Sequence, residues 1–172
     1  MKRIAIIGNA GGGKSTLARK LSDMLDIPHF EIDKFQWKPD WTMYPADEFE
    51  AAHDDILTRE VWILDGFASW QSIEKRLELA DTAILIDLPL WMHFWLIAER
   101  QFNWYKGDMA DKPGGHPAPP PTKKLFEVVW NIDRDFMPRL RAMVDDAEER
   151  GCRIFRIHDL DELDDLVSRI IP

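Results

Sequence analysis

The chain has 172 residues, of which 45% are hydrophobic and 31% are charged, as is typical of one globular domain with a sizeable core. The formal net charge is −9, which disfavours direct binding to nucleic acid. The apolar runs are too short to span a bilayer, so we expect no membrane association. The single cysteine, Cys152, cannot form an internal disulfide, which agrees with a cytoplasmic protein.

The N-terminal segment carries the most specific motif. Residues 3–7 predict a buried strand, and residues 14–26 predict a helix. Between them, Gly8-Asn9-Ala10-Gly11-Gly12-Gly13-Lys14-Ser15 fits G-x-x-x-x-G-K-[ST], the Walker A phosphate loop. A Gly-rich linker is the alternative, but the loop lacks Pro and a helical pattern follows at once. In such a loop, backbone N–H groups and a helix N-terminus surround phosphate. The segment therefore predicts a nucleoside triphosphate site made of Gly8, Asn9, Ala10, Gly11, Gly12, Gly13, Lys14, Ser15 and Thr16.

Strand and helix patterns alternate through the next hundred residues. In chain order, we expect a strand at 28–32, an irregular Trp- and Pro-rich segment at 34–45, a helix at 47–59, a strand at 61–64, a helix at 72–79, a strand at 82–87 and a helix at 91–105. Trp91 and Trp95 share one face of the last of these helices, and we expect them to pack in the core.

The C-terminal part begins with a segment rich in Pro and Gly. Residues at about 105–122 have no regular pattern and predict a loop or lid. A long helix is expected over residues 125–149, with a bend at Pro138. A strand at 153–157 and an amphipathic helix at 161–170 complete the pattern.

Strands that alternate with helices predict an α/β protein. We expect a five-stranded parallel sheet with helices on both faces and a lid, as a single domain over residues 1–172. Ligands of such sheets bind outside the carboxyl ends of the strands. Asp33, Asp65 and Asp87 each follow an apolar strand, and turn or cap roles are the alternatives for them.

With these residues placed, the chain resembles a P-loop kinase of the adenylate kinase and shikimate kinase group. It is most similar to the adenylate kinase-related proteins labelled "DNA topology modulation". The shared features are the loop Gly8–Thr16, the pattern Asp33-x-x-x-Trp37-x-Pro39-x-Trp41, the run Trp62-Ile63-Leu64-Asp65-Gly66, and Ala80-Asp81-Thr82 with Asp87-x-Pro89. The resemblance covers residues 3 to about 100, and the remainder matches in layout. It implies the three-layer P-loop NTPase fold.

The resemblance also implies roles for individual residues. Lys14 would contact the β- and γ-phosphates of ATP, Ser15 would ligate Mg²⁺, and Asp65 would order the Mg²⁺ water shell. Asp33 would lie near the acceptor hydroxyl. Arg100 and Arg134, on either side of the lid, would clamp phosphate, although both could instead lie on solvated helix faces. Ala68-Ser69 replaces the family's Pro-Arg, which argues against AMP as the acceptor.

These features together predict an ATP-dependent phosphotransferase. The enzyme would transfer the γ-phosphoryl group of ATP to a small-molecule acceptor, with a nucleotide or nucleoside among the candidates. The predicted catalytic residues are Lys14, Asp33, Asp65, Arg100 and Arg134, and the predicted metal ligands are Ser15 and Asp65. The alternatives are an ATPase that uses water as acceptor and a nucleotide-dependent binding or regulatory protein. The oligomeric state is left open by the sequence.

Overall fold

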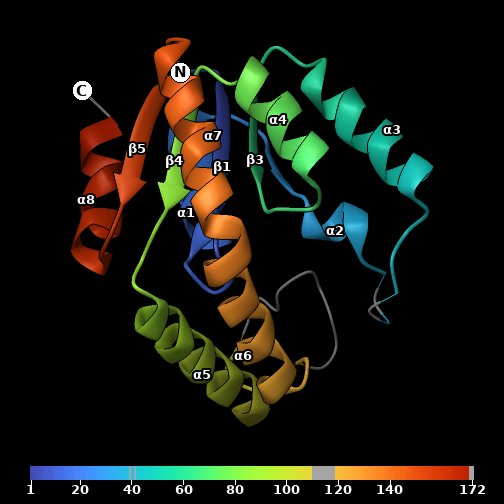
Figure 1. Ribbon diagram of the computed structural model, residues 1–172, viewed down its shortest axis with the longest axis vertical. Helices are drawn as coiled ribbons and strands as arrows, with labels where there is room; N and C mark the ends of the chain where they lie inside the picture. The colour runs from blue at the N-terminus through green and yellow to red at the C-terminus, as the bar shows by residue number, and fades with distance from the viewer. Residues whose placement is uncertain (39, 41, 110–118, 171–172) are drawn as a thin grey trace.

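A parallel sheet of five strands lies between two layers of helices (Figure 1). The computed structural model describes residues 1–38, 40, 42–109 and 119–170. The strand order is β2-β3-β1-β4-β5, and every neighbouring pair is parallel. The strands are β1 (Arg3–Gly8), β2 (His29–Glu31), β3 (Trp62–Asp65), β4 (Thr82–Ile86) and β5 (Arg153–Ile157). The predicted fold class is therefore confirmed.

The helices follow the predicted pattern, with ends that differ by a few residues. They are α1 (Lys14–Leu25), α2 (Asp33–Gln36), α3 (Ala46–Leu57), α4 (Trp70–Leu79), α5 (Leu90–Lys106), α6 (Thr122–Asn131), α7 (Met137–Glu149) and α8 (Leu160–Ile170). The short α2 occupies the start of the segment expected to be irregular. An antiparallel bridge pairs Trp37 with Met43 in the same segment.

The long helix predicted over residues 125–149 is divided in three. A π-helical turn, Ile132–Phe136, separates α6 from α7. Pro138 follows at the start of α7. Proline has no backbone N–H and its ring crowds the carbonyl four residues before it, so a wider turn at this point relieves the conflict.

Alternating strand residues form two separate halves of the core. In β1, Ala5 and Ile7 face the layer of α3, α4 and α7. Ile4 and Ile6 face the opposite layer, made by α1 and α8. Successive side chains of a strand point to opposite faces of the sheet, so a strand buried on both faces is apolar at nearly every position. The central strands β1 and β4 are long apolar runs for this reason.

The prediction that Trp91 and Trp95 pack in the core is wrong. Their exposed fractions are 61% and 56%. Met92, Ile97 and Trp104, on other faces of α5, are buried instead. The helix carries apolar residues all round, so its spacing alone could not indicate which face meets the sheet.

Half of the predicted lid lies outside the described residues. Residues 107–109 and 119–121 form irregular backbone on either side of it, and residues 110–118 are not described. No helix within the described ranges is long and apolar enough to cross a lipid bilayer.

Candidate functional site

The loop that joins β1 to α1 begins and ends with glycines that no other residue replaces easily. Gly8 has a φ of +138°, and a Cβ atom there would collide with the carbonyl of Ile86. Gly13 caps α1 in the left-handed conformation, with a φ of +82°. A side chain is strained at such angles. The loop therefore leads from β1 into the N-terminus of α1 along the path that the Walker pattern requires, at the carboxyl end of the sheet (Figure 1).

Lys14 is folded back over this loop. Its ammonium group donates a hydrogen bond to the carbonyl oxygen of Asn9 at 2.7 Å. Burial lowers the pKa of Lys14, Asp65 and Asp33 raise it, and Arg100 lowers it. These four charged groups therefore lie close enough to influence one another. Lys14, Asp33, Asp65 and Arg100 are four of the five predicted catalytic residues.

Ser15 and Asp65 form the centre of a three-residue chain of hydrogen bonds. The Ser15 hydroxyl donates to one carboxylate oxygen of Asp65 at 2.5 Å. The Nε2 atom of His29, on β2, lies 2.7 Å from the other carboxylate oxygen. Asp65 is the last residue of β3 and is 1% exposed. Its carboxylate is therefore fixed at both oxygens, and His29 is a site residue that the sequence did not reveal.

The oxygen atoms of Ser15 and Asp65 suit Mg²⁺. This ion prefers oxygen ligands and is usually bound by one or two protein groups together with waters and substrate phosphates. Within the described ranges, no group of three or more His, Cys, Asp or Glu side chains could hold a metal ion.

Asp33 and Arg100 lie close enough to Lys14 of the phosphate loop for their charges to act on it. Asp33 is the first residue of α2, and an added Cβ at Gly66 would lie 3.6 Å from its carboxylate oxygen. The residue is exposed to solvent. Burial raises the pKa of Asp33, Lys14 lowers it, Asp65 and Glu31 raise it, and Arg100 lowers it. A raised pKa suits a carboxylate that accepts a proton at neutral pH.

Arg76 is a buried cation behind these carboxylates. The residue is fully buried, and its guanidinium donates to the carbonyl oxygens of Gly66 at 2.8 Å, Phe67 at 2.7 Å and Ser72 at 3.0 Å. Burial lowers its pKa to about 10, although Asp65 and Asp33 raise it. Arg76 thus holds the turn after β3 and balances the negative charge of the site. No motif marks this residue in the sequence.

Two further contacts fix the phosphate loop to helices on either side of the predicted lid. The Asn9 side chain is fully buried and donates to the carbonyl oxygen of Val129, on α6, at 3.0 Å. The Nδ1 atom of His93, on α5, lies 2.9 Å from the carbonyl oxygen of Ala10. The loop is therefore held by α5 and α6 as well as by β1 and α1.

The remaining predicted residues lie at the edge of this group. Arg134 is in the π-helical turn, and its exposed guanidinium donates twice to Asp135 at 2.6 Å. Asp87, beyond the end of β4, accepts two hydrogen bonds from Arg141 of α7, at 2.9 and 2.7 Å. The phosphate-clamping role of Arg134 stays a prediction, and Asp87 serves to join β4 to α7.

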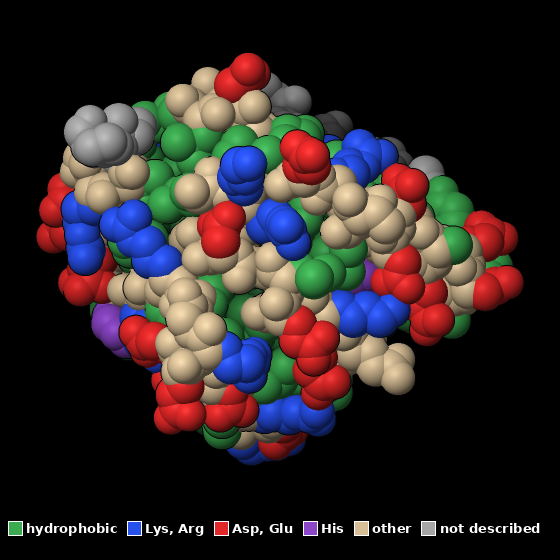
Figure 2. Space-filling model, turned by 90° about the horizontal axis from the view of Figure 1, so that it is seen from above, with side chains coloured by type: hydrophobic (Ala, Val, Ile, Leu, Met, Phe, Trp, Pro, Cys, Tyr) green, Lys and Arg blue, Asp and Glu red, His purple; other side chains and the backbone are tan. Residues whose placement is uncertain are grey.

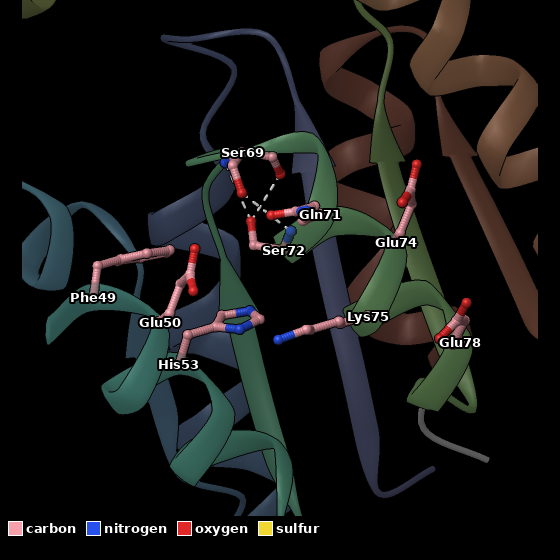
Figure 3. Close-up of a pocket in the computed structure, with 9 residues that line it drawn as sticks. All are labelled: Phe49, Glu50, His53, Ser69, Gln71, Ser72, Glu74, Lys75 and Glu78. Carbon is pink, nitrogen blue, oxygen red and sulfur yellow. Dashed lines mark hydrogen bonds between the residues drawn. The ribbon is translucent and has the colours of Figure 1, made fainter. Parts of the chain in front are cut away.

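A separate pocket of about 320 Å³ lies between α3 and α4 (Figure 3). None of its lining residues belongs to the predicted site. His53 stacks on Phe49, and Lys75 of α4 points toward it across the pocket. The pocket is lined by Phe49, Glu50, His53, Ser69, Gln71, Ser72, Glu74, Lys75 and Glu78.

Comparison with known proteins gives relatives of low sequence identity that span nearly the whole chain. No family model matches. The protein is 24% identical to an uncharacterised Bacillus subtilis protein, YqaC, over 99% of this chain and 96% of that one. A shikimate kinase from Bacteroides thetaiotaomicron has a TM-score of 0.57 at 14% identity, with 98% and 95% of the two chains covered. An uncharacterised protein from Eubacterium ventriosum has a TM-score of 0.53 at 14% identity, covering 98% and 94%.

These similarities concern the fold. The chain and the shikimate kinase share an α/β architecture with a parallel sheet between helices along almost their whole length. A Walker loop lies between the first strand and first helix of this chain. The protein therefore has the three-layer P-loop NTPase fold that the sequence predicts.

Proposed function

We propose that the protein is an ATP-dependent kinase that phosphorylates a small molecule. The observation that carries the proposal is the grouping of Lys14, Asp65, Asp33 and Arg100, whose charges act on one another at the mouth of the phosphate loop. A loop that only bound or hydrolysed a nucleotide would need the first two residues. We assign Asp33 and Arg100 to the acceptor, which a kinase needs in addition to the nucleotide.

The donor half of the site would hold the ATP phosphates. Backbone N–H groups of the loop and the N-terminus of α1 would surround them, and Lys14 would leave the Asn9 carbonyl for a phosphate oxygen. Ser15 and Asp65 would hold Mg²⁺, which neutralises charge on the phosphates when bound. His29 and Arg76 would keep Asp65 and its turn in position.

The acceptor half would orient a hydroxyl group. Asp33 would accept its hydrogen bond and take its proton as the acceptor oxygen bonds to the γ-phosphorus, while the bond from that phosphorus to the β,γ-bridging oxygen breaks and ADP leaves. Arg100 and Lys14 would face the charge that develops on the transferred group. A nucleotide, a nucleoside or a small hydroxylated acid would meet these requirements.

An aromatic cluster lies at the turn after β3, and we assign it to the apolar part of an acceptor. The ring of Phe136 lies 5.3 Å from Phe67 and 5.4 Å from Trp70, and the Arg139 guanidinium lies 4.2 Å from the Trp70 ring. The cluster supports an acceptor that has an apolar or planar part.

Direct binding to nucleic acid is not part of the proposal. The net charge is −9. On the face shown in Figure 2, acidic and basic side chains are interspersed, and no continuous basic stripe crosses it. Phosphate backbones are bound by such stripes.

The proposal is tested with Lys14→Ala, Asp33→Asn and the control Lys20→Ala, a lysine on the exposed face of α1. Acceptors are first found by thermal shift with a non-hydrolysable ATP analogue, among nucleosides, nucleotides and hydroxylated acids such as shikimate. We expect Lys14→Ala to lose roughly a hundredfold or more in transfer, because the positive charge that would stabilise the transferred phosphoryl group is removed. The Lys20→Ala variant should retain the transfer activity of the unchanged protein.

Asp33→Asn separates a kinase from the alternatives. It should reduce transfer to the acceptor while ATP binding persists. If ATP is hydrolysed at the same rate with and without every acceptor, and Asp33→Asn has no effect, the protein is an ATPase. If ATP binds but is not consumed, it is a nucleotide-dependent binding or regulatory protein.

A further inference from the structure

The exposed face of α5 carries an apolar stripe that nothing in the proposed reaction uses. Four of its aromatic residues are more than half exposed: Trp91 at 61%, Trp95 at 56%, Phe102 at 59% and Tyr105 at 70%. Ala98 lies between them and is also exposed. We refer to these five residues as the aromatic stripe.

The spacing of the aromatic stripe is that of a helix-pairing seam. Its members follow one another at intervals of four, three, four and three residues. This is the repeat of 3.5 residues that keeps one face of a helix against a partner helix. The opposite face of α5 bears His93, which contacts the phosphate loop, and Arg100, which acts on Asp33. The stripe therefore faces away from the site.

The order of residues in the stripe favours a second copy of the same helix. The large residues are arranged nearly symmetrically about Ala98. If a second α5 lies antiparallel, with Ala98 on the two-fold axis, Trp91 meets Tyr105 of the other copy and Trp95 meets Phe102. The small side chain of Ala98 lets the two helices approach at the centre. An isologous contact of this kind needs a self-complementary surface.

The area of the stripe agrees with such a contact. A buried aromatic residue removes about 150–250 Å² from solvent, so these four, each more than half exposed, offer on the order of 500 Å² per copy. Two copies would bury about 1,000 Å² in total, near the lower limit for a specific interface. Antiparallel helices also place their opposite macrodipole ends together.

The adjoining helix α6 provides room beside the seam. Phe126 of α6 contacts Phe94 of α5, with ring centroids 5.1 Å apart. A shallow hollow of about 400 Å³ lies there, lined by Phe126, Glu127, Trp130 and Asn131. Trp130 is itself 51% exposed.

We propose that the protein forms a two-fold symmetric dimer through the aromatic stripe of α5. The interface is small, so the dimer is expected to dissociate on dilution. The proposal is independent of the reaction proposed above, because none of its residues is assigned to the site.

Sedimentation or light scattering across low to high micromolar concentrations tests the association. The full chain should pass from monomer to dimer as its concentration rises. Trp95→Glu should weaken dimerisation by roughly tenfold or more, because a carboxylate would be buried without a partner. Leu79→Glu is the matched control, since Leu79 is also an exposed apolar residue, at the far end of α4. The Leu79→Glu variant should dimerise as the unchanged protein does.

A cross-linking experiment tests the register. In a Cys152→Ser background, Ala98→Cys should be joined rapidly across the axis by a short bifunctional maleimide, and Leu79→Cys should not. Thermal melting checks that each variant is folded. A monomer at every concentration, a dimer unaffected by Trp95→Glu, or equal cross-linking at both positions would overturn the proposal.

Discussion

Asp65 accepts hydrogen bonds at both carboxylate oxygens, and the two donors have different consequences. The Ser15 hydroxyl would exchange this bond for a metal ion when nucleotide binds. The bond to His29 does not conflict with the metal and can persist. His29 is therefore a positioning residue, which keeps one carboxylate oxygen occupied and the other aimed at the phosphate loop.

The change His29→Ala should raise the Mg²⁺ concentration needed for half-maximal activity and lower kcat by roughly tenfold, as is usual when a partner of a metal-binding carboxylate is lost. His29→Gln keeps an N–H donor at similar reach and should recover most of this loss. Steady-state kinetics at varied Mg²⁺ measure both effects. Equal activities for the Ala and Gln variants, or an unchanged Mg²⁺ dependence, would show that His29 only fills space.

The roles of residues that belong to a sequence motif or follow a strand could be predicted from the sequence. The roles of residues that act through another side chain could not. Lys14 and Ser15 follow from the Walker pattern, and Asp65 follows from its place at a strand end. His29 lies in an ordinary short strand and acts only because β2 and β3 are paired in register, with Glu31 beside Asp65. Arg76 likewise resembles any arginine of an amphipathic helix until the fold buries it.

At the scale of elements, the connection from β1 to α1 requires glycine at position 8 for two reasons. Its φ is positive, and its backbone lies close to the backbone of β4. We expect Gly8→Ala to cost about 3 kcal/mol or more in the free energy of unfolding, because strain at positive φ adds to a collision with the backbone of β4. Gly107, at the end of α5, also has a positive φ, of +81°, but an added Cβ meets nothing within 4 Å. Gly107→Ala should therefore cost only about 1–2 kcal/mol.

Urea unfolding of the two variants separates these contributions. Equal losses would mean that backbone angle alone limits Gly8. A difference in midpoint at an unchanged denaturant slope would confirm the steric contribution.

Strands and helices were easier to predict than the faces they present. The alternation of apolar runs and amphipathic segments specifies five strands and the helices between them. Apolar residues lie on every side of α5, so its sequence does not indicate which face is exposed. That face is evident only from the packing of Met92, Ile97 and Trp104. The π-helical turn before Pro138 is a second example, since a proline predicts a disturbance but not its form.

The order of the strands in the sheet could not be predicted from the sequence either. All five are short and several are almost wholly apolar, so no pattern distinguishes a central strand from its neighbour. The observed order, β2-β3-β1-β4-β5, places β1 in the middle. Its neighbours are β3, which ends at Asp65, and β4, which ends just before Asp87. The fold class could be predicted, whereas the arrangement around the phosphate loop needed three dimensions.

For the molecule as a whole, His53 makes stability depend on pH. Burial lowers the pKa of His53 to about 4, with Arg76 and Lys75 lowering it and Asp54 raising it. Below about pH 6.5 the unfolded chain binds a proton that the folded chain does not, so stability falls as the pH drops toward 4. This residue should account for a loss of roughly 2–3 kcal/mol over that range.

The measurement is urea unfolding at several pH values between 7 and 4. His53→Gln removes the titrating group and should flatten this part of the pH dependence, whatever its effect at pH 7. His158→Gln, a change at an exposed histidine, should keep the slope of the unchanged protein. A slope that His53→Gln leaves unaltered would assign the pH dependence to other groups.

The contacts of Asn9 and His93 connect the phosphate loop to the helices beside it. They join it to α6 and α5, and α5 carries the aromatic stripe on its opposite side. Any ligand that shifts the loop would therefore act on the helix that we propose as the surface for association. By reciprocity, if nucleotide binding strengthens pairing of the two copies, pairing strengthens nucleotide binding by the same factor. One helix thus gives the protein a direct path by which its concentration in solution could set its affinity for nucleotide.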